Sequence, residues 1–537
     1  MATYDGERKQ WNGRERPSIL NPEANIGQIV WNLLGRTPDN VIQIDADNDL
    51  YMTCAEMRLR IVRIGKNLRN MGCTRGDMVS LVCTNSENVV PVYIACLTIG
   101  MVVNPLAPVF NRNDLVHMMR QTQSRVIFCD EDNRATVELA ALEAIVQKPL
   151  IFVMGESAGQ AISVDKLLKH VKKEESSCPR YMGDSKKLLA VVLCSSGTTG
   201  LPKGVCLSHA HLIENDVFSD DVDAGPIFNF SALFWATGMF AMLTSLYNQR
   251  PRVITRKPFD ADTLIDVIEK YHVEDVFTPP SYVASLVNHP RFADADFSSV
   301  KRWTMGGAIV SEELRKKLAD RLPRGVAKSL YGTSEIGIVT AADHPSEHGS
   351  VGTLVSNLAV KIVDDAGRRL GPTERGEIRL KYKHKILGYL DNEEATLDAF
   401  DDEDFFKSGD IGYFDHNGML FVVDRIKDII KYKNYQISPS DLEAVIEKIE
   451  GVQSVCVTGI PVADRSSDLA TAVIVKKEGS TLTEEEVIQL VNRQVSDFKQ
   501  LRGGVYFVER LPTSAAGKVL RRAVKELVIS RLSVQKK

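Results

Sequence analysis

The chain has 537 residues, of which 44% are hydrophobic and 25% charged, and its formal net charge is −4 at pH 7. This length predicts two or three subdomains rather than one core, and the ordinary composition and weak negative charge argue against a nucleic-acid-binding protein. Nine scattered cysteines without a Cys-x-x-Cys pair argue against a disulfide framework or a zinc site, and they favour a reducing compartment.

The sequence shows no segment typical of a signal peptide or a membrane span. The N-terminal stretch is polar and charged and lacks the apolar core of a signal peptide. The longest apolar stretch, residues 89–103, is interrupted by Pro91 and Gly100 and is too short to cross a membrane well. We therefore expect this stretch to form a buried helix.

Short apolar runs alternate with longer amphipathic segments through the first two thirds of the chain. Residues 57–71 and 114–121 have the periodicity of helices. The alternation is typical of α/β proteins with a largely parallel sheet, and it occurs twice. The expected strands are 78–83, 125–129, 150–153 and 188–193 in the first unit, and 252–255, 273–277 and 302–305 in the second.

The pattern changes after about residue 350. Shorter runs at 360–363, 376–380 and 419–423 are separated by turn sequences, which predicts a small β-rich subdomain. Helices and strands then alternate again over a length that suits a separate small α+β domain. The predicted class is therefore α/β: a large N-terminal domain, 1–425, with two α/β sheet subdomains over about 25–350 and a β-rich subdomain over about 350–425, then a small C-terminal domain, 426–537.

A loop rich in glycine and hydroxyl side chains follows the strand expected at 188–193. Glycines let the backbone approach an anion closely and turn its N–H groups inward, and Lys203 adds a positive charge. Ser208 can cap a helix after the loop, so the loop lies where α/β proteins hold phosphates. The Walker pattern is not met, because the lysine follows a proline. The candidate phosphate-binding residues are Ser195, Ser196, Gly197, Thr198, Thr199, Gly200 and Lys203.

This loop resembles that of the adenylate-forming superfamily, which comprises acyl-CoA synthetases, 4-coumarate:CoA ligases and beetle luciferases. The chain looks closest to the insect luciferase-like fatty acyl-CoA synthetases. Four further motifs follow in the order of the family, and the resemblance extends over about residues 25–530. It implies that the C-terminal domain is mobile and turns on a hinge, here Lys427.

Residues 328–335 pack a tyrosine, a glycine, hydroxyls and a carboxylate into one short run. A ring can stack on a base, a glycine admits the nucleotide, a hydroxyl can bond a phosphate, and a carboxylate can hold magnesium. The second hallmark of the family has this form, usually with threonine where this chain has Ser334. The candidate nucleotide-binding residues are Tyr331, Gly332, Thr333, Ser334 and Glu335, with Glu335 also the predicted metal ligand.

The resemblance gives a role to two other motifs. The glycine pair before Ala308, Gly306 and Gly307, would lie against the adenine and the acyl group. Asp410 would accept two hydrogen bonds from the ribose diol, and Arg425 would contact the ribose or the phosphate.

The predicted mechanism follows from charge. The carboxylate of an acid must attack the α-phosphate of ATP, and both groups are anions. Lys518 matches the adenylating lysine that the family carries in a Gly-Lys loop near the C-terminus. Lys518 and Lys203 would offset the negative charge that builds in the transition state, and with Glu335 they are the predicted catalytic residues.

In the family, the C-terminal domain then rotates and presents another face, which admits the thiol of coenzyme A. Lys431, Lys433 and Asn434 occupy that face in this chain. Asn434 replaces a glycine that borders the pantetheine path. Asparagine tolerates positive φ, but its side chain fills space that glycine leaves open, which predicts a narrower path.

The predicted acyl site departs from the luciferase pattern. Family members with small aromatic substrates or luciferin often carry histidine where this chain has Trp235, and a tryptophan resembles the gate of fatty acyl-CoA synthetases. A core aromatic is the alternative interpretation. A basic run at 381–385 is a further departure, facing either the coenzyme A phosphates or solvent. The candidate acyl-site residues are Trp235, Thr237, Gly238, Met239, Gly306 and Gly307.

The sequence therefore predicts an ATP-dependent acid:CoA ligase for an apolar carboxylic acid, a medium- or long-chain fatty acid, using ATP, Mg²⁺ and coenzyme A. A luciferase-like monooxygenase and a catalytically impaired nucleotide or acyl sensor remain alternatives. The expected partners are small molecules, with no nucleic acid and no transmembrane segment. The chain ends without Ser-Lys-Leu, so the localisation stays open between peroxisome, by family resemblance, and cytosol.

Overall fold

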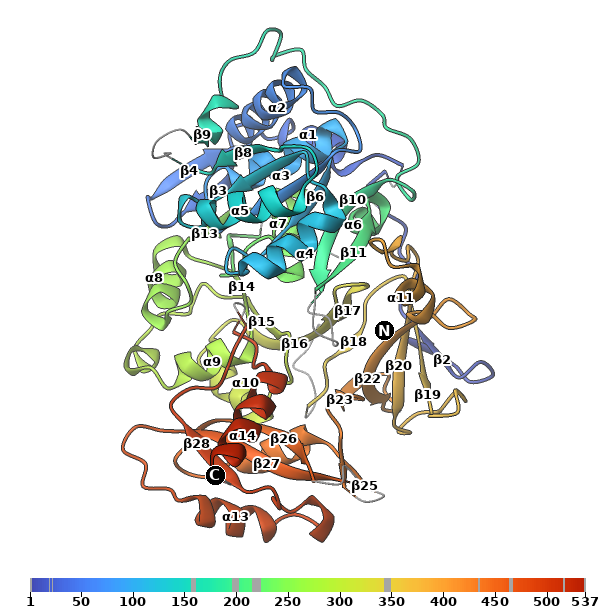
Figure 1. The fold of residues 1–537 in the computed structure, drawn as a ribbon, viewed down its shortest axis with the longest axis vertical. Helices are drawn as coiled ribbons and strands as arrows, with labels where there is room; N and C mark the ends of the chain where they lie inside the picture. The colour runs from blue at the N-terminus through green and yellow to red at the C-terminus, as the bar shows by residue number, and fades with distance from the viewer. Residues whose placement is uncertain are drawn as a thin grey trace.

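The computed structural model describes residues 2–18, 20–21, 23–155, 161–195, 202–214, 224–341, 349–432, 435–462, 467–514 and 517–535. Within these ranges the strands form three large sheets and two small ones (Figure 1). The mixed α/β class predicted from the sequence is confirmed.

The first large sheet contains the four strands expected in the first α/β unit. Its central strands are parallel, as the alternation of runs and helices predicts. At one edge the direction changes: β10 is parallel to β6 but antiparallel to β11, and β11 is antiparallel to β21. The order is β21 (Gly388–Tyr389), β11 (Lys203–Ser208), β10 (Leu189–Ser195), β6 (Val102–Pro105), β5 (Met78–Val82), β7 (Val126–Cys129), β8 (Leu150–Val153) and β9 (Ile162–Ser163).

The second large sheet contains the three strands expected in the second unit. Strands β14, β15 and β16 are parallel, so their carboxyl ends meet at one edge. The order is β18 (Thr353–Leu354), β17 (Gly337–Ala341), β16 (Val326–Thr333), β15 (Arg302–Gly306), β14 (Asp275–Thr278), β12 (Ile227–Phe228), β13 (Arg252–Ile254), β3 (Val41–Asp45) and β4 (Leu50–Thr53).

The third sheet is antiparallel and draws on both ends of the large N-terminal part. Besides the strands expected after residue 350, it includes a hairpin from the start of the chain, whose Trp11 is 1% exposed and stacks on Phe414 at 4.4 Å between ring centroids. The sequence analysis did not predict this hairpin. The order is β1 (Thr3–Asp5), β2 (Gln10–Asn12), β19 (Leu358–Val363), β20 (Gly376–Tyr382), β22 (Phe406–Phe414) and β23 (Leu420–Arg425).

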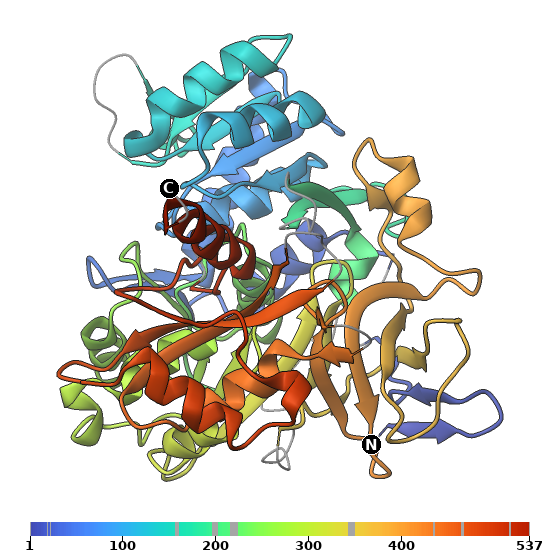
Figure 2. The same ribbon diagram turned by 60° about the horizontal axis from the view of Figure 1, so that its bottom comes forward.

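The last hundred or so residues carry the two small sheets and lie below the large sheets in Figure 1, against α9 and α10. Figure 2 brings this part (orange to red) forward and shows its helices packed on its own strands. The small sheets are β24 (Ile430–Tyr432) with β25 (Tyr435–Ile437), and β26 (Val452–Pro461), β27 (Asp468–Lys476) and β28 (Val505–Val508).

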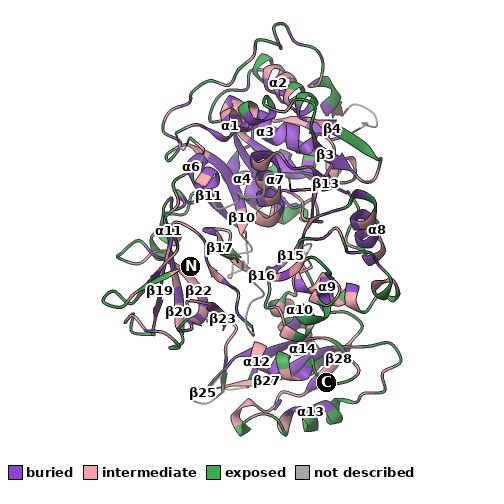
Figure 3. Cartoon of the chain, turned by 180° about the vertical axis from the view of Figure 1, so that it is seen from behind, coloured by how far each residue is buried: buried purple, intermediate pink, exposed green. Residues whose placement is uncertain are grey.

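Residues 89–103, expected as one buried helix, divide into a helix and a strand. The helix α3 ends at Ile99 because Gly100 takes the left-handed conformation, φ 85°, and β6 follows. The helix is apolar on all sides because α1 and α2 cover it on the face away from the sheet. Figure 3 shows this region and the central strands as the most buried part of the molecule.

The helices pack on the faces of the sheets, and α1 contacts both α3 and α7, with α3 beside β6 of the first sheet and α7 beside β12 and β13 of the second. Several begin at side-chain caps, such as Thr53 with Glu56 before α2. No described helix is both long and apolar enough to cross a membrane. The helices are α1 (Ile26–Leu34), α2 (Cys54–Asn70), α3 (Val89–Ile99), α4 (Arg112–Thr122), α5 (Arg134–Ala144), α6 (His209–Glu214), α7 (Ala236–Asn248), α8 (Ala261–Tyr271), α9 (Pro280–Val287), α10 (Glu312–Ala319), α11 (Glu393–Asp398), α12 (Pro439–Ile446), α13 (Glu484–Asn492) and α14 (Arg521–Gln535).

Candidate active site

A buried carboxylate, Asp410, lies where the second and third sheets meet. It faces Arg425 across the antiparallel pair β22–β23, and Arg425 Nε lies 3.2 Å from Asp410 Oδ1. Tyr331, on β16, donates a hydrogen bond of 2.6 Å to Asp410 Oδ2. Burial raises the pKa of Asp410, while the positive charge of Arg425 lowers it. Three predicted nucleotide-binding residues from separate motifs therefore form one cluster.

A second carboxylate, Glu335, lies in the turn between β16 and β17. Its Oε1 accepts a hydrogen bond of 2.8 Å from Tyr389 Oη. Burial raises the pKa of Glu335, and the bond from Tyr389 lowers it. No lysine or arginine in the described part of the chain forms an ion pair with Glu335. A partly buried carboxylate without a neighbouring ion-pair partner is a hard oxygen ligand of the kind that Mg²⁺ prefers, so the residues present fit this metal.

Lys203 lies beside the same tyrosine. Its ammonium is 5.2 Å from the centroid of the Tyr389 ring, a distance that allows a cation–π contact. Tyr389 is held there because β21 pairs with β11, with Val205 opposite Tyr389. The first and second hallmark motifs therefore meet through a tyrosine that belongs to neither.

The phosphate loop lies between two antiparallel strands, β10 and β11, so the element that follows the loop is a strand. Ser195 ends β10 and faces Lys203, which begins β11. Ser208 caps α6 as expected, since its Oγ accepts a bond from His211 N, but β11 separates that helix from the loop. The predicted residues Ser196, Gly197, Thr198, Thr199 and Gly200 lie outside the described residues.

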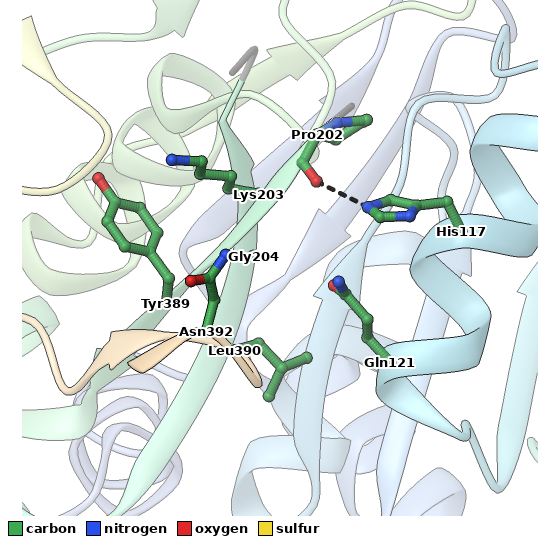
Figure 4. A pocket seen from close by; sticks show the side chains of 8 residues that line it. All are labelled: His117, Gln121, Pro202, Lys203, Gly204, Tyr389, Leu390 and Asn392. Carbon is green, nitrogen blue, oxygen red and sulfur yellow. Dashed lines mark hydrogen bonds between the residues drawn. The ribbon is translucent and has the colours of Figure 1, made fainter. Parts of the chain in front are cut away.

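A small polar pocket opens beside the start of β11 (Figure 4). Its volume is about 260 Å³. His117, on α4, contacts Pro202 O through Nε2 at 3.2 Å, and Lys203 and Tyr389 form the opposite side. The pocket therefore continues the polar surface of the candidate site toward α4. Its lining residues are His117, Gln121, Pro202, Lys203, Gly204, Tyr389, Leu390 and Asn392.

Lys518 reaches the Asp410 cluster from the C-terminal part of the chain. Burial lowers the pKa of Lys518 to about 8, with a further contribution from the positive charge of Arg425 and an opposing one from Asp410. The same electrostatic coupling lowers the pKa of Asp410. The ammonium of Lys518 therefore lies near Asp410 and Arg425, beside the place predicted for the nucleotide.

The remaining predicted nucleotide-binding residues lie on the edge formed by β15 and β16. Gly306 ends β15, and Gly307 and Ala308 follow it. Gly332 and Thr333 end β16, where Thr333 Oγ1 accepts a bond of 3.1 Å from Ile336 N and so fixes the turn that carries Ser334. These residues and Tyr331 thus share the carboxyl edge of two parallel strands, where α/β sheets bind ligands.

The predicted acyl site centres on the start of α7. Trp235 is the residue before the helix, and its Nε1 is buried without a hydrogen-bond partner among the residues that the structure describes. Thr237 donates a bond of 3.0 Å to Ser231 Oγ, which closes the turn before the helix. A Cβ atom at Gly238 would lie 2.1 Å from Ala232 O, so only glycine fits beneath this turn. Met239 is fully buried in the core.

The predicted coenzyme A face is described only in part. Lys431, on β24, is exposed, and its backbone N lies 3.5 Å from Asp468 Oδ2. Lys433 and Asn434 lie outside the described residues. Lys427, the predicted hinge, lies in the turn between β23 and β24.

The three lysines of the basic run at 381–385 are exposed, which agrees with the alternative that the run faces solvent. Lys383 pairs with Glu214 at 2.7 Å, and Lys385 pairs with Asp404 at 2.7 Å. His384 is buried, and its Nε2 lies 3.0 Å from Glu214 Oε2. The positive charges of this run are therefore matched by acids of the same chain.

Sequence reasoning missed Tyr389. The tyrosine follows Gly388, whose φ of 130° favours glycine. These two residues are the whole of strand β21, which is too short to be recognised in the sequence. A Gly-Tyr pair after an apolar run was the available signal. It becomes informative only once β21 is known to pair with β11.

Comparisons with known proteins agree with this geometry. The model of the AMP-binding enzyme family matches residues 31–390, and that of the AMP-binding enzyme C-terminal domain matches 441–518. A probable 4-coumarate–CoA ligase of Dictyostelium discoideum is 28% identical, over 95% of this chain and 96% of its own length. A luciferin 4-monooxygenase of Nipponoluciola cruciata is 30% identical, over 87% of each chain.

Solved structures share the fold. The anthranilate CoA ligase AuaEII, in complex with anthranoyl-AMP, superposes with a TM-score of 0.86 at 19% identity and covers 96% of this chain and 99% of its own. The match at this identity supports the architecture of several sheets and a C-terminal unit. With family models covering both parts of the sequence, the chain belongs to the AMP-binding enzymes, the adenylate-forming superfamily.

Proposed function

We propose that this enzyme is an AMP-forming acid:CoA ligase that activates an apolar carboxylic acid, a medium- or long-chain fatty acid, and transfers it to coenzyme A. One observation carries the proposal. Lys518, Asp410, Arg425 and Tyr331 come from four separate stretches of the chain and meet at one place. The relatives named as CoA ligases support the same reaction class.

The first half-reaction brings two anions together, and the described residues suit this task. Asp410, held by Tyr331 and Arg425, presents carboxylate oxygens that can accept hydrogen bonds from a ribose diol. The ammonium of Lys518 lies nearby and would offset the charge that develops at the α-phosphate. Mg²⁺ held by Glu335 would stabilise the pyrophosphate leaving group. No side chain is required as a nucleophile, because the carboxylate of the substrate attacks the phosphate itself.

The second half-reaction requires a different face of the C-terminal part. We propose that residues 426–537 form a mobile domain that turns near Lys427, as the resemblance implies. The turn between β23 and β24 suits a hinge because it connects the third sheet to the small C-terminal sheets. Rotation would withdraw Lys518 and bring the region of Lys431 toward the acyl-adenylate.

ATP–pyrophosphate exchange driven by a panel of acids tests the proposal. The panel contains fatty acids of increasing chain length, hydroxycinnamic acids and short dicarboxylic acids, and each reaction is followed by acyl-CoA release after addition of coenzyme A. Exchange and thioester formation with medium- or long-chain fatty acids are expected. Exchange with hydroxycinnamic acids alone would overturn the substrate class, and the absence of exchange with every acid would overturn the ligase function.

A luciferase-like monooxygenase is the second candidate, because a luciferin 4-monooxygenase is among the relatives. That enzyme class also forms an adenylate, so exchange alone does not separate the two functions. Acyl-CoA release without light emission in the presence of luciferin, ATP and oxygen supports the ligase. Light emission would support the monooxygenase.

Trp235→Ala tests the acyl site directly. The indole is the largest side chain at the start of α7, and its removal opens space on the acyl side. We expect a changed chain-length profile, while the KM for ATP stays within about twofold. An altered KM for ATP with an unchanged profile would assign Trp235 to the structural core.

A further inference from the structure

The loop that carries Lys518 contacts the start of helix α9 in the large N-terminal part. Ser281 Oγ, in the first turn of α9, donates a hydrogen bond of 2.6 Å to the carbonyl oxygen of Gly517. This bond joins two segments more than 200 residues apart in the sequence. The oxygen that accepts it belongs to the residue directly before Lys518.

The neighbouring side chain on α9, Tyr282, shapes the same contact. Gly517 has φ of 74°, and a Cβ atom there would lie 2.2 Å from Tyr282 Cε1. The Tyr282 ring is stacked on Phe259, with centroids 3.9 Å apart and planes at 8°, and so has little room to retreat. Glycine is therefore required at 517 both by its backbone conformation and by the tyrosine beneath it.

Hydrogen bonds within the loop connect Gly517 with Lys518, so a contact that fixes the position of Gly517 also fixes that of Lys518. Ser514 N donates to Lys518 O at 2.7 Å, and Lys518 N donates to Ser514 Oγ at 3.2 Å. Gly517 N donates to Ser514 O at 2.9 Å. These three bonds tie both Gly517 and Lys518 to Ser514, so the bond from Ser281 to Gly517 can hold Lys518 in place.

We propose that Ser281 and Tyr282 are positioning residues that seat the Lys518 turn for the adenylation step. The inference rests on the proposed function, because that function assigns Lys518 to the first half-reaction. If the C-terminal part rotates afterwards, the bond between Ser281 and Gly517 must break. The contacts of Ser281 and Tyr282 with Gly517, called the seat below, then stabilise only the arrangement in which Lys518 takes part in adenylation. They contribute nothing to the transfer to coenzyme A.

Separate assays of the two half-reactions test the seat. Ser281→Ala should lower acid-dependent pyrophosphate exchange by about tenfold, the effect of losing one well-formed hydrogen bond. Transfer from a supplied acyl-adenylate to coenzyme A should stay unchanged. Ser281→Thr keeps the hydroxyl and should restore exchange. Ser285→Ala, at an exposed position of the same helix, is the matched control and should behave as the wild type.

Equal losses in both half-reactions, or unchanged exchange in Ser281→Ala, would overturn the proposal. Gly517→Ala should lose exchange more severely, and Tyr282→Ala in the same chain should recover part of that loss. Failure of Tyr282→Ala to recover any exchange would show that the ring does not set the seat.

Trypsin cleavage after Lys518, without substrates, gives a readout that does not depend on the reaction. Ser281→Ala should be cleaved there faster than the wild type and Ser285→Ala. If no acid supports exchange in the wild type, the proposed function fails, while faster cleavage of Ser281→Ala still supports the seat. Equal cleavage rates in all three proteins would overturn it.

Discussion

The two carboxylates of the candidate site, Asp410 and Glu335, are held in different ways. Asp410 has a tyrosine on one oxygen and an arginine on the other, whereas the only side-chain partner of Glu335 among the described residues is Tyr389. Asp410 also lies near the ammonium of Lys518. The negative charge of a carboxylate that lies beside a cation is already balanced. A carboxylate that is shielded from water without a neighbouring cation has an unfavourable desolvation free energy, unless a cation binds together with the ligand. From this comparison we propose that Asp410 binds a neutral, hydroxyl-bearing part of the nucleotide and that Glu335 holds a metal ion.

The largest expected effect on the exchange rate is that of Lys518, the lysine that lies near Asp410. Lys518→Ala should lower acid-dependent pyrophosphate exchange by roughly 10²–10³-fold, because it removes one preorganised charge from the transition state. Transfer of a supplied acyl-adenylate to coenzyme A should continue at the wild-type rate. An unchanged exchange rate would show that Lys518 is not the adenylating lysine.

Substitution of the two carboxylates tests the comparison itself. Glu335→Gln should raise the magnesium concentration that gives half-maximal exchange by roughly 10- to 100-fold, the range for changes close to a bound metal. Asp410→Asn should leave the magnesium titration unchanged and raise the KM for ATP. If both variants shift the magnesium titration equally, the two carboxylates do not have separate roles.

The tyrosine partners provide a finer test. Tyr389→Phe removes the only side-chain hydrogen-bond partner that Glu335 has among the described residues, and it should lower exchange about tenfold, since hydrogen bonds to charged groups are among the stronger ones. Tyr331→Phe should cost less, about threefold, because Arg425 still holds Asp410. The measurement is exchange at saturating ATP and magnesium. A larger loss in Tyr331→Phe would reverse the comparison.

The smallest effect is a shift in pH dependence. The pKa of Lys518 is lowered to about 8, so the fraction of the lysine that is charged falls as pH rises through 8. The adenylation rate should fall over the same range, because the charged form is the one that offsets the phosphate. Lys518→Arg should keep its charge and move this decline to higher pH. A decline at the same pH in both proteins would assign it to another group.

The fold follows from the sequence where the signal is local. The parallel strands β5, β7 and β8 coincide with short apolar runs, because a strand buried on both faces has little tolerance for polar residues. The hallmark motif ending at Glu335 is equally local, since β16 and its turn are continuous in the sequence.

Contacts between segments that lie far apart in the chain could not be predicted from the sequence. Tyr389 joins the site because β21 pairs with β11, and Ser281 joins it because α9 meets the Lys518 turn. The residues around Tyr389 and Ser281 in the sequence show no pattern that would predict either pairing. The same applies to the phosphate loop, where nothing in the composition distinguishes a hairpin from a strand-to-helix connection.

The N-terminal hairpin has a consequence for the order in which the chain folds. Trp11, on β2, pairs with Val360 on β19 and stacks on Phe414, so the start of the chain completes a sheet whose other strands are synthesised last in the large N-terminal part. During synthesis this hairpin must wait until residue 425 has left the ribosome before its sheet is complete. Both α/β sheets can collect most of their strands earlier, so the third sheet should close late and be the slow step of folding.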